Sequence, residues 1–276
     1  MLLMMRQSQE SGVAFTAKSI LNLTGAKFYS DIQMPGMETN LKIRSAFFWK
    51  QFEKGEFETE CIQLVKKKTV TGSTVLDVGA WVGAYTLLFS ELVGEKGKVY
   101  AFEPDPEVRE VLSDNVEQNN LGNVWIERYC LSDRVGPLKF YCSDGLYQVL
   151  MGHSGSSLLS GRASENSREI DVESITIDKF CEARDIRPHG MKIDVEGAEA
   201  LVIKGAQKTI RNFGPWVLLE FHGHFMTEQD RILAWDRIVE RSKTVCFVRG
   251  DSTLYKVGDK LESFPDCVYF NAFIEY

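Results

Sequence analysis

The stretch that most constrains this fold runs from position 75 to position 86 and reads VLDVGAWVGAYT. Its pattern predicts a short buried strand, a turn with two glycines, and a helix. A second apolar run, residues 98–102, precedes Glu103, which lies 20 residues after Gly83. A glycine turn lets a ligand approach the backbone, and an acid at the tip of the next strand accepts hydrogen bonds from ribose hydroxyls. Together the two segments predict a nucleoside site.

The spacing of the glycines favours one class of nucleoside ligand. A dinucleotide fingerprint, G-x-G-x-x-G, places a pyrophosphate at a helix N-terminus. Here the turn instead reads D-x-G-x-x-x-G, from Asp77 through Gly79 to Gly83. A carboxylate at position 77 would repel a pyrophosphate, whereas it suits an ammonium or sulfonium group. We therefore predict S-adenosylmethionine (SAM) rather than NAD as the cofactor. A strand, turn and helix without any ligand is the alternative, and the second acid, Glu103, argues against it.

Composition sets further limits on function. The 276 residues are 44% hydrophobic and 26% charged, which is enough for one large α/β domain with an N-terminal addition. A net charge of −7 gives no basic face for nucleic acid, and no apolar run reaches membrane-spanning length. The six cysteines show no C-x-x-C spacing and are typical of a reducing compartment. We expect a soluble cytoplasmic protein without a signal peptide that acts on a small molecule. Its oligomeric state stays open, with a homodimer as one option.

The chain divides into two regions by its hydrophobic pattern. Residues 1–70 carry apolar residues at helical spacing, which predicts two or three helices with an extended connection near positions 35–36. From position 73 strands alternate with helices, which predicts a mostly parallel sheet covered on both faces. We therefore predict a helical extension or lid over residues 1–70 and a SAM-binding domain over residues 71–276. The expected strands are 75–78, 98–102, 124–131, 191–195, 216–221, 245–248 and 268–274, and the expected helices are 84–93, 106–118, 177–183, 198–212 and 227–242.

A segment rich in glycine and serine interrupts this alternation at residues 143–168. It lies between two shorter extended runs, residues 137–142 and 170–175. Long loops in compact domains are usually either functional or disordered. The segment is therefore either a solvated surface loop or a flap over the site.

Polar side chains gather where two expected strands end, in the stretches KIDVEG at 192–197 and EFHGH at 220–224. Ligands of open parallel sheets bind outside the carboxyl ends of the strands, so these groups should converge beside the cofactor. Lys192 and Asp194 are two residues apart on a strand and share a face, which predicts an ion pair. Either the pair only orients Asp194, or one of the two residues deprotonates a substrate hydroxyl.

His222 is the other candidate catalytic residue, because imidazole titrates near neutral pH and can act as a general base. An H-x-H pair with His224 and nearby carboxylates is also a known pattern for zinc, iron or manganese. We favour the base without a metal. The predicted catalytic residues are Asp194, Lys192 and His222.

These segments resemble the FkbM family of SAM-dependent methyltransferases over about residues 55–225. The matching pieces are LDVGA at 76–80 with Gly83, Tyr85 and Thr86, FEP at 102–104, LSD at 131–133, IDVEGAE at 193–199 and LEFH at 219–222. The DVEGAE element is the most specific of them, and GEFE at 55–58 is similar to an upstream element that faces the cofactor in the family. Trp81 departs from the pattern, because the family usually has a small polar residue there.

The resemblance implies a class I Rossmann-like fold with a seven-stranded sheet in the order 3-2-1-4-5-7-6, whose last strand is antiparallel. It also implies methyl transfer to an oxygen of a sugar, polyketide or other small metabolite. Glu103 would hold the ribose, residues 130–132 would border the adenine, and Asp194 would lie near the methionine end. The expected cofactor-binding residues are Glu58, Asp77, Gly79, Ala80, Gly83, Thr86, Glu103, Pro104, Cys130, Leu131, Ser132 and Asp194.

Two other functions remain open at this point. A module that binds SAM or a nucleoside without methyl transfer would be expected to lack acids and bases at the strand ends, and this chain has them. An NAD-dependent oxidoreductase should carry the three-glycine fingerprint, which is missing.

Overall fold

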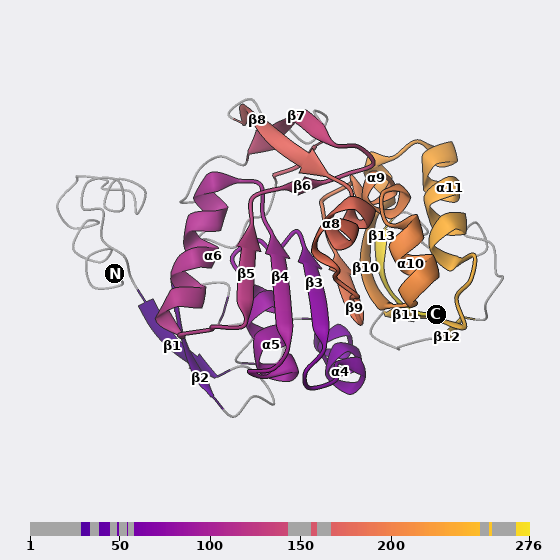
Figure 1. Cartoon of the computed structure of the whole chain (residues 1–276). Helices are drawn as coiled ribbons and strands as arrows, with labels where there is room; N and C mark the ends of the chain where they lie inside the picture. Colours follow the sequence, from indigo (N-terminus) through magenta and orange to yellow (C-terminus); the bar gives the residue numbers. More distant parts are fainter. Residues whose placement is uncertain are drawn as a thin grey trace, which may run out of the picture.

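A central sheet of eight strands organises the computed structural model, which describes residues 29–33, 39–44, 49, 54, 58–142, 156–158, 167–248, 254–255 and 269–276 (Figure 1). In sheet order the strands are β12 (Leu254–Tyr255), β11 (Thr244–Val248), β13 (Tyr269–Glu275), β10 (Trp216–His222), β9 (Gly190–Ile193), β3 (Thr74–Val78), β4 (Lys98–Phe102) and β5 (Val124–Glu127). Apart from the added edge strand β12, this is the predicted order 3-2-1-4-5-7-6. β13 runs antiparallel to both of its neighbours, as expected.

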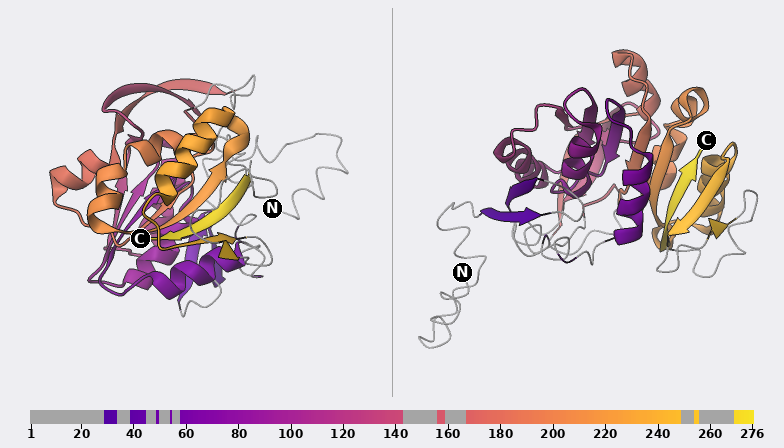
Figure 2. Two further views of the ribbon diagram at one scale, coloured as in Figure 1. Left: turned by 90° about the vertical axis from the view of Figure 1, so that its right-hand side faces the viewer. Right: turned by 90° about the horizontal axis from the view of Figure 1, so that it is seen from below.

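Helices cover both faces of this sheet, which confirms the predicted fold class. One face carries α4 (Thr59–Lys68), α5 (Ala84–Val93) and α6 (Pro106–Gln118). The other carries α8 (Ile177–Arg184), α9 (Glu199–Lys204), α10 (Gln207–Phe213) and α11 (Glu228–Val239). In the left view of Figure 2 the purple and the orange helices lie on opposite sides of the strands. The start of α6 follows from local chemistry, because the Asp105 side chain accepts hydrogen bonds from the N–H groups of Glu107 and Val108.

Two predicted elements are divided in the structure. The single helix expected over residues 198–212 is two helices, α9 and α10, with Gly205 between them. A Cβ atom at Gly205 would overlap the carbonyl oxygen of Ser132, so the chain turns where the backbones touch. The strand expected over residues 124–131 stops at Glu127, and the next residues form β6 (Cys130–Leu131) in another sheet.

That second sheet holds the two extended runs beside the glycine- and serine-rich segment. Its order is β6-β8-β7, with β7 spanning Gly136–Cys142 and β8 spanning Arg168–Ile175. Most of the predicted loop or flap at 143–168 lies outside the described residues. Residues 156–158 of this segment are described. Ser157 forms an antiparallel bridge with Tyr141 of β7, which places these residues against that strand.

The N-terminal region adds both a helix and a hairpin. The apolar run at 61–65 lies in α4, as predicted, whereas the expected extended connection contains a hairpin of β1 (Tyr29–Gln33) and β2 (Asn40–Arg44). Alternate residues Ile32, Leu41 and Ile43 are buried in the same core as α5. The other helical runs predicted before position 58 lie outside the described residues, apart from Trp49, which is also buried in this core. Among the described residues, no helix is both long and apolar enough to cross a membrane.

Candidate cofactor and catalytic site

A cavity opens at the carboxyl ends of β3, β4 and β9. Part of its wall is apolar and is formed by Val78, Phe102, Val108, Leu131, Phe140 and Leu158. The remaining wall includes two acids on separate sides, Glu103 at the end of β4 and Asp194 after β9. The predicted cofactor residues that line the cavity are Gly79, Glu103, Pro104, Cys130, Leu131 and Asp194. The others, Glu58, Asp77, Ala80, Gly83, Thr86 and Ser132, lie outside this lining.

Glu103 is fixed at the cavity wall by backbone groups. Its two carboxylate oxygens accept hydrogen bonds from the N–H of Trp81, at 3.0 Å, and from the N–H of Asp105, at 2.9 Å. Burial and the nearby charge of Asp105 raise the pKa of Glu103 to about 8, although these two hydrogen bonds oppose the shift. The side chain therefore has a fixed direction and a charge that changes close to neutral pH.

The two glycines of the turn are required by packing. Gly79 has a φ of 80°, and a Cβ atom there would overlap the backbone carbonyl of Asp194. Gly83 has a φ of 101°, and its Cβ would lie 2.8 Å from a methyl group of Leu112. The first turn thus lies directly against the turn after β9, which brings Gly79 and Asp194 to the same cavity. The two glycines of the turn are therefore needed for packing within the protein as well as for the approach of a ligand.

Asp77 does not line the cavity, although its charge motivated the choice of cofactor. Its side chain is fully buried and accepts a hydrogen bond of 2.5 Å from Thr86 Oγ1. It is aligned with Lys192 on the adjacent strand β9, whose positive charge opposes the rise in the pKa of Asp77 caused by burial. In the structure, the positive charge of Lys192 stabilises the Asp77 carboxylate. Direct contact between Asp77 and a cofactor stays a prediction.

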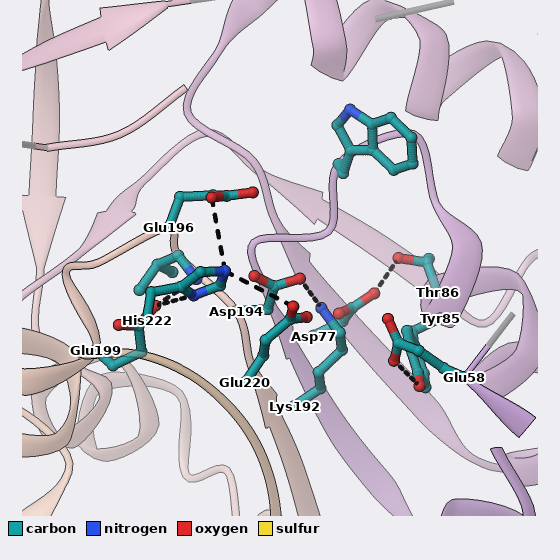
Figure 3. Close-up of polar contacts among 12 residues, drawn as sticks. Glu58, Asp77, Tyr85, Thr86, Lys192, Asp194, Glu196, Glu199, Glu220 and His222 are labelled. Atoms are coloured by element: carbon teal, nitrogen blue, oxygen red, sulfur yellow. Dashed lines mark hydrogen bonds and ion pairs between the residues drawn. The ribbon is translucent and has the colours of Figure 1, made fainter. Parts of the chain in front are cut away.

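Lys192 lies among the carboxylates of Asp77, Asp194 and Glu220 (Figure 3). Its ammonium lies 2.9 Å from Asp194 Oδ2, so the predicted ion pair is present. It also lies over the ring of Tyr85, whose hydroxyl donates a 2.6 Å hydrogen bond to Glu58. Burial opposes its charge, but Asp194 and Asp77 raise the pKa of Lys192 above its ordinary value. The raised pKa favours the protonated form of Lys192, and a catalytic role for this residue stays a prediction.

His222 is surrounded by three acids. Its Nδ1 lies 3.1 Å from Glu199 Oε1, and its Nε2 lies 3.6 Å from Glu196 and 3.7 Å from Glu220 (Figure 3). Burial works against the charged ring, but the hydrogen bond that His222 donates to Glu199 and the surrounding negative charges raise the pKa of His222 to about 9. The ring thus holds a proton at neutral pH, where we predicted a base. His224 is exposed, with its ring centre 6.0 Å from that of His222.

Three residues of this cluster received no role from the sequence. Glu199 is fully buried at the start of α9, and Glu220 lies near the end of β10. The hydroxyl of Tyr269 donates a 2.5 Å hydrogen bond to Glu220. The DVEGAE motif could have drawn attention to Glu199. Nothing local identifies Tyr269, because it reaches the site only through the pairing of β13 with β10.

Left-handed backbone marks the edges of the site. Trp81, Glu196 and Glu58 have φ values of 49°, 54° and 38°. Non-glycine residues in this region are strained and often cluster at functional sites. Trp81 lines the cavity and donates its backbone N–H to Glu103, so the residue that departs from the family pattern is part of the wall.

Comparison with known proteins then identifies the family. The model of the methyltransferase FkbM domain matches residues 77–244, which is more than half of the chain. The chain belongs to the FkbM methyltransferase family. Membership confirms the family and the enzyme class predicted from the sequence, together with SAM as the cofactor.

Individual relatives cover smaller parts of the chain. Hexuronic acid methyltransferase AglP of Haloferax volcanii is 27% identical over 166 residues, which span 60% of this chain and 62% of the relative. A probable cobalt-precorrin-6B C(15)-methyltransferase of Sulfolobus acidocaldarius is 42% identical over 69 residues, or 25% of this chain and 36% of the relative. The solved structure of methyltransferase FkbM from Methylobacillus flagellatus KT gives a TM-score of 0.46 at 14% identity, covering 73% of this chain and 43% of that chain.

Proposed function

We propose that this protein transfers a methyl group from SAM to an oxygen of a small metabolite, with a sugar or sugar acid as the acceptor. The observation that carries the proposal is the cavity that joins an apolar wall to two separate acids, Glu103 and Asp194. The name of the relative AglP supports a sugar acid as the acceptor class.

The residues around the cavity fit the parts of SAM. The cavity is mostly apolar with a few polar groups, as small-molecule sites usually are. The apolar wall beside Leu131 and Phe140 suits an adenine ring, and the fixed carboxylate of Glu103 suits the ribose hydroxyls. The acids at the other side, Asp194 and Glu196, suit the positively charged methionine end. When bound, SAM supplies a methyl group on a sulfonium sulfur that an acceptor oxygen can displace.

The protein's own residues orient the acceptor and keep charges in place. Lys192 is buried and fixes one oxygen of Asp194, whose side chain stays partly exposed at the cavity. Lys192 and His222 also hold the pKa of Asp194 below its usual value against the opposing effect of burial, so its carboxylate accepts a hydrogen bond from the acceptor hydroxyl. Lys192 and His222 therefore contribute alignment through Asp194, and Asp194 contributes modest proton acceptance.

Binding and turnover test separate parts of the proposal. Thermal shift and calorimetry with SAM, S-adenosylhomocysteine and NAD should show binding of the first two and no binding of NAD. Transfer of a labelled methyl group should then be measured with a panel of sugars, hexuronic acids and simple alcohols. Tight NAD binding would overturn the cofactor assignment. SAM binding without transfer to any acceptor would favour the binding module considered from the sequence.

A further inference from the structure

A potential metal-ligand set lies next to the cofactor cavity. One ligand atom from each of Asp194, Glu220 and His222 lies within 4.8 Å of the other two. The three residues come from the ends of the adjacent strands β9 and β10. Asp194 also lines the cavity, so the set borders the space proposed for the methyl donor. We propose that Asp194, Glu220 and His222 bind a divalent cation that holds an oxygen of the acceptor.

The orientation of His222 is the strongest argument for this site. Histidines that bind metals usually donate their second ring nitrogen to a carboxylate, which fixes the ring. Glu199 is fully buried and takes this position, with its Oε1 3.1 Å from His222 Nδ1. Glu199 is itself held by the N–H of Gly197, at 3.0 Å. The other ring nitrogen, Nε2, is thereby directed towards Glu220.

The charges around the set also favour binding of a further cation. Ligand atoms of Asp194 and Glu220 lie within 4.8 Å of each other, and two carboxylates this close favour a proton or a cation between them. Lys192 takes only one oxygen of Asp194. One oxygen of Glu199 is buried with no hydrogen-bond partner in the described part of the chain. The carboxylates of this cluster are Glu58, Asp77, Asp194, Glu196, Glu199 and Glu220, against the two cationic side chains Lys192 and His222.

The donor set indicates the kind of cation and acceptor. Two carboxylates and one imidazole suit Mn²⁺ or Fe²⁺ better than the soft metals that prefer thiolates. Three protein ligands leave positions for an outside oxygen. An acceptor with two neighbouring oxygens, such as a vicinal diol or a hydroxy acid, would fill them. The inference thus rests on the proposed function and narrows its acceptor class.

Mn²⁺ titration of the full chain tests the site directly. The protein is treated with EDTA, dialysed, and titrated with Mn²⁺ while electron paramagnetic resonance reports the free ion. We expect one saturable site per chain. Glu220→Gln and His222→Gln should each weaken Mn²⁺ binding by at least about 10-fold, the scale known for altered metal-site residues. His224→Gln is the matched control, because this exposed imidazole lies only two residues away and should leave binding unchanged.

Two outcomes would overturn the proposal. The first is the absence of saturable binding at millimolar Mn²⁺ in the wild-type protein. This result would mean that protonated His222, rather than a metal ion, balances the charge of Asp194 and Glu220. The second is unchanged Mn²⁺ affinity in both variants, which would place the ion elsewhere. Glu220→Gln keeps an oxygen for the Tyr269 hydroxyl, so this variant should fold, and SAM calorimetry checks that it does. Mn²⁺ binding without SAM binding would count against the proposed function but not against the cation site.

Discussion

At the scale of single residues, the site is built from acids in unlike surroundings. Glu103 accepts hydrogen bonds from backbone N–H groups, and buried Asp77 accepts one from the Thr86 hydroxyl. Asp194 forms an ion pair with Lys192. We propose that the same functional group serves three purposes, which are ligand contact at Glu103, charge balance at Asp77 and acceptor orientation at Asp194. Each purpose makes a separate prediction.

Replacing Glu103 with alanine should weaken SAM binding about 10-fold or more, because hydrogen bonds to a charged group contribute roughly 1.5–3 kcal/mol. Calorimetric titration measures the change. Glu117→Ala, an exposed acid near the end of α6, is the control and should bind SAM normally. An unchanged affinity in Glu103→Ala would remove the ribose role.

SAM affinity should rise with pH around the titration of Glu103. Burial and the charge of Asp105 raise the pKa of Glu103 to about 8, so the side chain is mostly protonated below that pH. Above it, the carboxylate can accept hydrogen bonds from both ribose hydroxyls. Calorimetry across this range should show tighter binding at higher pH in the wild type and a flatter profile in Glu103→Gln. Parallel profiles in the two proteins would contradict this assignment.

Replacing Lys192 with methionine should destabilise the protein by about 3 kcal/mol or more, because it leaves Asp77 buried without a cation. Urea unfolding measures this loss, with the exposed Lys96→Met as the control. Burial raises the pKa of Asp77 and Lys192 opposes that rise, so without Lys192 the carboxyl should take up a proton more readily. Unchanged stability would show that the two side chains are not coupled.

At the scale of elements, the site depends on close approach between backbones. The turn after β3 touches the turn after β9 at Gly79, and the junction of α9 and α10 touches the chain just after β6 at Gly205. These contacts explain why one predicted helix is two helices. They also bring residues 130–132 towards the cavity from a strand outside the main sheet.

Gly205→Ala should therefore destabilise the protein by about 1–3 kcal/mol, the usual cost of overpacking. The added methyl group would overlap the carbonyl oxygen of Ser132, which belongs to the backbone and cannot rotate away. Gly122→Ala is the matched control, because a Cβ atom at that position would meet nothing within 4 Å. Equal unfolding midpoints in urea would show that the contact at Gly205 is looser than the structure indicates.

At the scale of the whole molecule, the N-terminal region shares the core of the sheet. Ile43 and Trp49 belong to the same buried cluster as Val75 and Phe89. Arg44 adds a buried ion pair with Asp114 on α6, at 2.5 Å. We predicted two regions that divide at position 70. Whether they unfold together or separately tests that division.

A shared core should make the chain unfold in one step. Circular dichroism and tryptophan fluorescence should give coincident urea transitions, because Trp49 lies in the N-terminal region while Trp216 and Trp235 lie on the sheet side. Arg44→Met should shift this single transition to lower urea, because it removes the buried ion pair between Arg44 and Asp114. Two separate transitions would instead support an independent N-terminal domain.

The sequence by itself determined the fold class and the acids at the strand ends, and the order of the main strands followed from the resemblance to the FkbM family. The spacing of hydrophobic residues, the positions of glycines and the polar residues at strand ends are local properties. They can be read from the sequence without knowing which residues are in contact. The Lys192–Asp194 pair was predictable for the same reason, since two residues on one strand face share a direction. The family followed from the motifs at the strand ends.

Only the tertiary structure decided what each polar group does. Asp77 is buried against Lys192 on another strand, and His222 holds a proton because Glu199, Glu196 and Glu220 converge on it. Tyr269 reaches Glu220 across paired strands that are 49 residues apart in sequence. Charge and hydrogen bonding act through space, so the pKa of a side chain depends on neighbours that chain position does not reveal.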